Sequence, residues 1–178
     1  GLAFVYPPEA GKTNEIPYGS GLLAIPIYKT VAEATKHHSQ INTSLVYIGA
    51  DRAMKGGIEA LDDSHIKVVS MITEGVPEKD AKILGRHATK LGKVFNGPSS
   101  IGIVSAGSCR LGVIGGAFDN LVLSKHLREG PFGVITNSGG RSHEIFWHCS
   151  EFATGLTTPL CVGGEAYLGR HYARYRPL

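Results

Sequence analysis

Short apolar runs alternate with glycine-rich turns and with amphipathic stretches along most of this chain. The clearest run, Val68–Ile72, is followed at once by a glycine–proline turn and then by a stretch of helical spacing that ends near Gly92. This order of strand, turn, helix and strand is typical of βαβ units and predicts a parallel sheet. The predicted strands are Leu2–Tyr6, Ile25–Tyr28, Leu45–Ile48, Val68–Ile72, Val94–Phe95, Leu111–Ile114, Phe132–Thr136 and Leu160–Val162.

Capping signals and glycines place the helices between these strands. Thr30 and Glu33 have the spacing of a capping box, and Pro77 suits the first position of a helix. The predicted helices run from Thr30 to about His37, over Ala53–Leu61, from Pro77 to Leu91, and from Ser138 to about Ala153. The polar stretch with Gly11, Pro17, Gly19 and Gly21 is predicted as a loop.

Composition narrows the class of protein. The chain has 178 residues, of which 42% are hydrophobic and 19% charged, so a packed core is expected. Its net charge of +3 comes from Ala166–Leu178, which we interpret as a loose terminus or packing arm, or else as an anchoring segment. Because no basic stripe covers a face and no apolar run reaches the roughly 18–20 residues of a membrane span, we expect neither nucleic-acid binding nor a membrane span.

Cysteine and histidine spacing argues against a metal site. The three cysteines are widely spaced and form no C-x-x-C, which favours buried thiols in a reducing compartment over a disulfide framework or a zinc knuckle. His143 and His148 are five residues apart, so on a helix their imidazoles diverge by about 140°. We therefore expect no metal site in this chain.

Two kinds of turn carry candidate chemistry. Ser138-Gly139-Gly140 stands between a strand and a helix, where free backbone N–H groups and the helix dipole favour an anion; an ordinary glycine-rich turn is the alternative. The turns Gly49–Arg52 and Thr73–Pro77 both follow predicted strands and would form one wall of a crevice. Arg52 is then available for a phosphate, or is instead paired with a neighbouring carboxylate of Asp51 or Glu74.

Ordered motifs give a family resemblance. Thr30–Ala34, Ile72–Pro77 and Gly97-Pro98 resemble the α subunit of succinyl-CoA synthetase in order and spacing. A closer resemblance, to the corresponding region of ATP-citrate lyase, rests on Phe4–Pro7, Ala50–Arg52, Gly115–Asn120, Ser124, Lys125, Arg128, Gly130, Ser138–Glu144 and Gly163–Glu165. It extends from about residue 3 to about residue 165.

This resemblance implies an α/β fold. A Rossmann-like CoA-binding domain with a parallel sheet, lacking its first βα unit, would occupy residues 1–125. The start of a flavodoxin-like CoA-ligase domain, with the basic tail, would occupy residues 126–178. The residues implied to line CoA are Ala50, Arg52, Ile72, Thr73, Glu74 and Pro98. Ser138, Gly139 and Gly140 would hold an acyl carboxylate or the transferred phosphoryl group.

The resemblance also implies a reaction that this chain cannot complete alone. In the family, a nucleotide phosphorylates an enzyme histidine, the phosphate passes to a carboxylate, and CoA displaces it. None of the eight histidines here stands in the family's Gly-His-Ala-Gly context, and Asn137 replaces the usual arginine. The implied cofactor is CoA, with ATP and the phosphohistidine supplied by other ligase domains or subunits, in the cytoplasm or the mitochondrial matrix. The alternative is a non-catalytic structural subunit of a larger assembly that retains the ligase fold.

Overall fold

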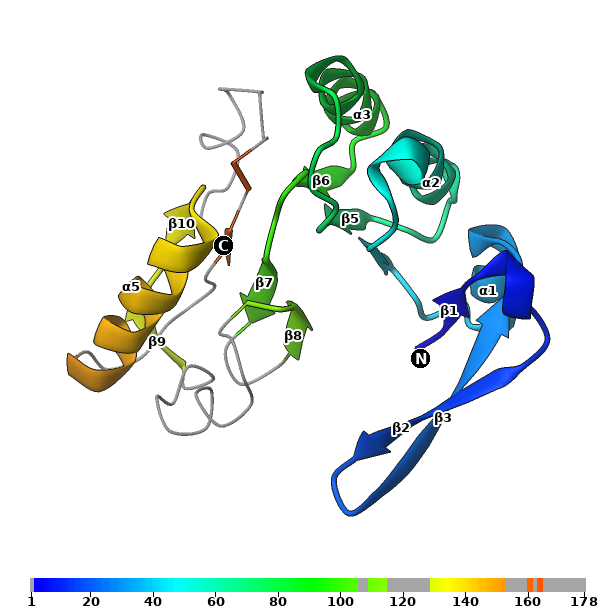
Figure 1. Cartoon of the computed structure of the whole chain (residues 1–178), viewed down its shortest axis with the longest axis horizontal. Coiled ribbons are helices and arrows are strands. Elements are labelled where there is room, and N and C mark those ends of the chain that lie inside the picture. The colour runs from blue at the N-terminus through cyan, green and yellow to red at the C-terminus, as the bar shows by residue number, and fades with distance from the viewer. Residues whose placement is uncertain (1, 106–108, 115–128, 153–159, 162, 165–178) are drawn as a thin grey trace.

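The fold is described from a computed structural model (Figure 1), for residues 2–105, 109–114, 129–152, 160–161 and 163–164. These residues form three small sheets and their flanking helices, so the expected α/β class is confirmed. The strands are β1 (Phe4–Val5), β2 (Thr13–Tyr18), β3 (Gly21–Tyr28), β4 (Thr43–Val46), β5 (Val68–Met71), β6 (Val94–Asn96), β7 (Gly102–Ser105), β8 (Cys109–Gly112), β9 (Glu129–Phe132), β10 (Ile135–Thr136) and β11 (Leu160–Cys161). The helices are the short 3-10 helix η1 (Pro7–Glu9), α1 (Val31–His37), α2 (Ala50–Asp62), α3 (Glu78–Lys90) and α5 (Gly139–Phe152).

The predicted parallel sheet consists of three strands in the order β4-β5-β6. Thr43 pairs with Val68 and Val68 with Val94, so all three strands begin at the same edge. Helices α2 and α3 make the two crossovers and pack side by side (Figure 1), as the βαβ pattern predicts. Pro77 is the N-cap of α3 rather than its first helical residue, because its ψ of 139° is still extended.

Apolar side chains at helical spacing bury one face of each of these helices against the sheet. The core cluster consists of Val46, Ala53, Ala60, Leu61, Ile66, Val69, Met71, Val76, Leu84, Ala88 and Phe95. Gly57 lets the two helices approach, since a Cβ there would lie 2.8 Å from Cδ2 of Leu84. Gly57 therefore allows the close spacing of α2 and α3.

The loop predicted over the stretch with Gly11, Pro17, Gly19 and Gly21 is wrong: this stretch forms β2 and the turn into β3, whose second half is the predicted strand Ile25–Tyr28. Strands β2 and β3 are antiparallel: Thr13 pairs with Pro26 at one end and Tyr18 with Gly21 at the other. The hairpin that they form extends away from the rest of the chain (Figure 1). Pro17 suggested a loop, but β2 is an edge strand in the order β1-β3-β2, where a missing N–H is tolerated. Most of β2 is exposed, so no alternation of buried and exposed residues marked it as a strand.

The third sheet has the order β10-β11-β7-β8 and was predicted only in part. Phe132–Thr136, expected as one strand, is divided between β9 and β10, while the strand expected at Leu111–Ile114 lies two residues earlier as β8. Strand β7 was not predicted. It pairs antiparallel with β8 and β11, so this sheet is mixed. The residues quoted for the resemblance at Gly115–Asn120, Ser124, Lys125, Arg128 and Glu165, the basic tail and the expected boundary at residue 125 lie outside the described residues.

Side chains of α2 hold α1 at two points one turn apart. The Thr30 hydroxyl accepts a hydrogen bond from the Glu33 N–H (3.1 Å), which confirms the N-terminal cap. A carboxylate oxygen of Glu59 accepts from the Val31 N–H at 2.9 Å. One turn later on both helices, the Thr35 hydroxyl donates to Asp63 at 2.8 Å. Glu59 of α2 and its C-cap residue Asp63 thus attach α1 to α2, which packs on the parallel sheet.

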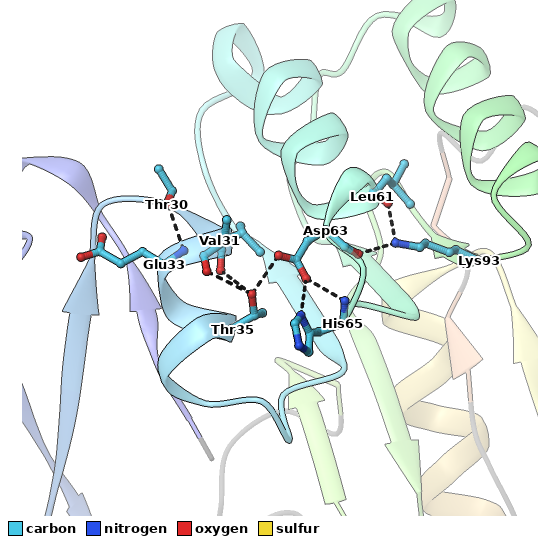
Figure 2. Close-up of polar contacts among 9 residues, drawn as sticks. Thr30, Val31, Glu33, Thr35, Leu61, Asp63, His65 and Lys93 are labelled. Carbon is cyan, nitrogen blue, oxygen red and sulfur yellow. Dashed lines mark hydrogen bonds and ion pairs between the residues drawn. The ribbon is translucent and has the colours of Figure 1, made fainter.

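Asp63 is the centre of a polar cluster at the end of α2 (Figure 2). Its side chain is only 7% exposed, and it accepts hydrogen bonds from the Thr35 hydroxyl and the His65 N–H. The ammonium group of Lys93 donates to the carbonyl oxygens of Leu61 (2.6 Å) and Asp63. These bonds satisfy carbonyl groups that every helix leaves free at its C-terminus.

Replacing Asp63 therefore has a clear expected effect. We expect Asp63→Ala to lower the free energy of unfolding by about 1–3 kcal/mol, because the Thr35 hydroxyl and the His65 N–H lose their charged acceptor. The matched control is Asp62→Ala, which removes a carboxylate 56% exposed that pairs with His87. This change is expected to cost less than about 1 kcal/mol. Urea unfolding of both variants measures the difference, and equal losses would contradict a stabilising role for the cluster.

Acid is expected to remove the contribution of Asp63. Burial alone would raise the pKa of this carboxyl group, but hydrogen bonds from Thr35 and from the N–H groups of His65 and Ile66, with the nearby imidazole, hold it below its ordinary 3.8. A lowered pKa stabilises the fold above that ordinary value, and the gain is lost as the pH falls through the folded pKa. Urea titrations from about pH 6 to about pH 3 should therefore show the wild type and Asp63→Ala converging in stability. A constant difference over this range would refute the assignment.

Candidate functional site

The candidate CoA-lining residues lie at the carboxyl edge of the parallel sheet, where three turns follow β4, β5 and β6. Thr73, just after β5, binds the neighbouring turn on one side: its hydroxyl donates to the Ile48 carbonyl oxygen at 2.8 Å. On the other side, its own carbonyl oxygen accepts from the Ser99 N–H at 3.0 Å. Gly75 and Ala50 are also neighbours, since a Cβ on Gly75 would lie 3.9 Å from that of Ala50. The structure therefore brings together the two turns predicted to form one wall and the turn that contains Pro98.

Burial divides the six predicted side chains into two groups. Ile72, Thr73 and Pro98 are buried. The N–H of Ile72 donates to the Val46 carbonyl oxygen at 2.9 Å, in the backbone bonding of β4 to β5. Ile72, Thr73 and Pro98 therefore belong to the packed interior beneath the carboxyl edge of the sheet. Ala50 is half-buried in the first turn of α2, and Glu74 and Arg52 are exposed. The groups free to meet a ligand are therefore those near the start of α2 and in the turn after β5.

Arg52 carries a positive charge at this edge. It lies in the first turn of α2, whose N-cap is Gly49, and its Nε is 3.8 Å from a carboxylate oxygen of Asp51. The sequence left open whether Arg52 pairs with a neighbouring acid, and the structure contains the pair with Asp51. Both side chains are well exposed, at 67% and 79%, so this pair contributes little free energy. An anion can therefore compete for the guanidinium, aided by the helix N-terminus beside it.

The turn at Ser138 begins α5. The Ser138 hydroxyl accepts from the Arg141 N–H at 3.5 Å, and the Ser138 N–H donates to the Thr136 hydroxyl at 3.1 Å. A Cβ on Gly139 would lie 2.8 Å from Cγ2 of Ile101, so this glycine packs closely against the chain before β7. Gly140 is exposed, and no atom lies within 4 Å of the position of a Cβ. The turn thus presents one open glycine at a helix N-terminus.

Gly163 and Gly164 link the two groups of turns, a role the sequence did not indicate. A Cβ on Gly163, whose φ is +85°, would collide with the Pro98 carbonyl oxygen. A Cβ on Gly164 would lie 3.9 Å from the Asn137 carbonyl oxygen, directly before the Ser138 turn. The only available signal was a glycine pair after a predicted strand, and that pattern does not specify its contacts.

Among the described residues, no group of three histidine, cysteine or acidic side chains is arranged to hold a metal ion. No helix in the same part of the chain is long and apolar enough to cross a membrane.

Comparisons with known proteins show which proteins this chain is similar to. Residues 7–75 match the CoA-binding domain family. A probable ATP-citrate synthase of Dictyostelium discoideum is 32% identical over 98% of this chain and 29% of its own length. An ATP citrate lyase of Methanothrix soehngenii, solved in complex with citrate and coenzyme A, is 30% identical with a TM-score of 0.87, over 91% of this chain and 26% of that one. Nearly the entire length of this chain resembles one part of ATP-citrate synthase.

More distant structures share the fold alone. A dinucleotide-forming acetyl-coenzyme A synthetase of Ca. Korarchaeum cryptofilum matches with a TM-score of 0.57 at 16% identity, over 86% of this chain and 32% of its own. The chain spans less than a third of the length of each of these three proteins. The predicted resemblance to ATP-citrate lyase is therefore confirmed, and it concerns one part of such proteins.

The Gly163 contact gives a test of how the two groups of turns are joined. We expect Gly163→Ala to lower the free energy of unfolding by at least about 2 kcal/mol, because the new Cβ meets backbone atoms and the positive φ disfavours alanine. Gly140→Ala is the matched control, since its site is open and helical. That change is expected to be neutral or to stabilise by up to about 1 kcal/mol. Thermal and urea unfolding measure both, and a tolerated Gly163→Ala would show that the contact is not needed.

Proposed function

We propose that this chain forms the CoA- and carboxylate-binding part of an ATP-citrate-lyase-like enzyme. CoA would lie across the carboxyl edge of the parallel sheet, with Arg52 and the first turn of α2 facing its phosphates. The observation that carries this proposal is the convergence of three turns on Thr73, beside a helix N-terminus and an exposed guanidinium. The match to the CoA-binding domain family and the similarity to a lyase solved with coenzyme A support it.

The Ser138 turn is the proposed site for the carboxylate or the transferred phosphoryl group. Its serine hydroxyl and open glycine stand at the N-terminus of α5, which favours an anion. In the proposed reaction an acyl phosphate forms there and the CoA thiol displaces phosphate. ATP and the phosphohistidine would come from other domains or chains, as in the succinyl-CoA synthetase type of ligase. The proposed division remains a CoA-binding domain at residues 1–125 and the start of a ligase domain at residues 126–178.

CoA titration of the purified chain tests the first part of this proposal. We expect Arg52→Ala to weaken CoA binding about tenfold or more, because a charge-assisted hydrogen bond to phosphate is lost. Arg86→Ala is the matched control: this arginine is also exposed but lies on the third turn of α3, away from the carboxyl edge. The affinity of Arg86→Ala for CoA should stay within about twofold of that of the wild type. Isothermal titration calorimetry measures the affinity of the wild type and of both variants.

The opposite results are equally informative. If CoA binds neither to the chain nor to the chain with its partner subunits, the site does not work and the non-catalytic structural alternative is favoured. If both arginine variants weaken binding equally, the effect is one of net charge and Arg52 is not at the site. Raising the salt concentration should weaken wild-type binding more than that of Arg52→Ala, since one phosphate contact is already missing in the variant.

A further inference from the structure

A fully buried polar network underlies the turn after β6. Asn96, the last residue of β6, has no exposed surface, and its Nδ2 donates to the hydroxyls of Ser70 (3.1 Å) and Ser100 (2.7 Å). Ser70 and Ser100 are 0% and 1% exposed. The Ser100 hydroxyl oxygen also accepts from the Gly102 N–H at 3.0 Å. The network therefore joins the middle of the parallel sheet to the first residue of β7.

The bond from Asn96 to Ser100 closes a loop with Pro98 at its centre. The same loop is tied to β5 through its backbone, because the Ser99 N–H donates to Thr73 and the Ser100 N–H donates to Met71 (3.2 Å). Gly97 lets the loop pass close to β5, since a Cβ at its φ of +108° would collide with the Met71 carbonyl oxygen. The loop thus has two backbone attachments and one side-chain closure.

Asparagine at this position has an energetic cost. Its Oδ1 has no hydrogen-bond partner among the described residues although it is fully buried. An unpaired buried acceptor destabilises a fold, and an apolar side chain of similar shape would avoid that penalty. Core packing alone therefore does not explain the residue, whereas fixing the position of the loop does.

We infer that Asn96 is a positioning residue for the CoA site. Through Ser100 it fixes the loop that carries Pro98, and so sets one wall of the crevice beside Thr73; this role in binding rests on the proposed function. Asn96 does not touch the ligand. Because Gly163 packs on the same loop, the network also determines where the Ser138 turn lies relative to that wall.

The test compares Ser70 and Ser100, whose hydroxyls both accept a hydrogen bond from Asn96. Ser100→Ala removes the acceptor inside the loop, and Ser70→Ala removes the acceptor in β5, outside the loop. Asn96→Leu removes both hydrogen bonds and keeps a buried side chain. We expect Ser100→Ala and Asn96→Leu to weaken CoA binding about tenfold, and Ser70→Ala to change it by less than about twofold, although each of them alters stability.

Amide hydrogen exchange gives a readout that does not depend on CoA. We expect the Ser99 and Ser100 N–H groups to exchange faster than in the wild type in Ser100→Ala and Asn96→Leu. In Ser70→Ala, once any change in global stability is allowed for, these two groups should exchange at the wild-type rate. If Asn96→Leu does not fold, Ser100→Ala decides the question alone. If the wild type binds no CoA, the proposed function fails, while the exchange rates still test the role of Asn96 in holding the loop. Unchanged exchange and affinity in Ser100→Ala, or equal effects from the two serine variants, would overturn the inference.

Discussion

The carboxyl end of β5 determines the positions of both neighbouring turns. Within three residues, Met71 and Thr73 accept backbone hydrogen bonds from the turn after β6, and the Thr73 hydroxyl bonds the chain after β4. In a parallel sheet all carboxyl ends meet at one edge, so a single strand end can arrange the whole crevice. Arg52 and Pro98 come from opposite sides of β5, and their relative position depends on these bonds. The candidate site is therefore set mainly by backbone geometry, with few side chains left to meet a ligand.

The parallel sheet has a different kind of polar network at each edge. At the amino edge, Asp63 and Lys93 make charge-assisted bonds that satisfy a helix end and attach α1. Such bonds are among the stronger ones in proteins, and this network mainly stabilises the fold. At the carboxyl edge, Asn96 and Ser100 make neutral bonds with one acceptor left unpaired among the described residues. Keeping formal charge out of that buried network leaves Arg52 as a positive group that an anion can reach.

The elements predicted correctly are those in which local signals and burial agree. Val68–Ile72 is apolar and central, and the cap at Thr30 needs only residues within four positions, so the sequence sufficed for β5 and α1. Strand β2, and with it the hairpin that it forms with β3, was missed because β2 contains Pro17 and has no buried face. Strand β7 was missed although its partner β8 is close in sequence; its other partner, β11, is distant in sequence, and no local pattern encodes that pairing.

The sequence likewise predicted only the local features of the candidate site. Glycine turns after apolar runs located the crevice and the Ser138 turn, since such turns fall at the carboxyl ends of parallel strands. The bond from Thr73 to Ile48 and the Gly163 contact each join two turns that are distant in sequence. No spacing rule encodes them, because each depends on how two turns are placed after the sheet has formed. Sequence therefore indicated which turns matter, and tertiary structure was needed to show what holds them.

A short path of backbone connects the two candidate sites and limits how they can move. Strand β7 begins two residues after Ser100, β11 pairs with both β7 and β10, and β10 leads directly to Ser138. Gly163 closes this path by packing on the loop that contains Pro98. On the proposed function, the CoA wall and the anion turn are therefore placed relative to each other within this chain, before any partner is added. A phosphoryl donor from another domain would then need to approach a preformed pair of sites, which is consistent with a chain that spans less than a third of the length of its relatives.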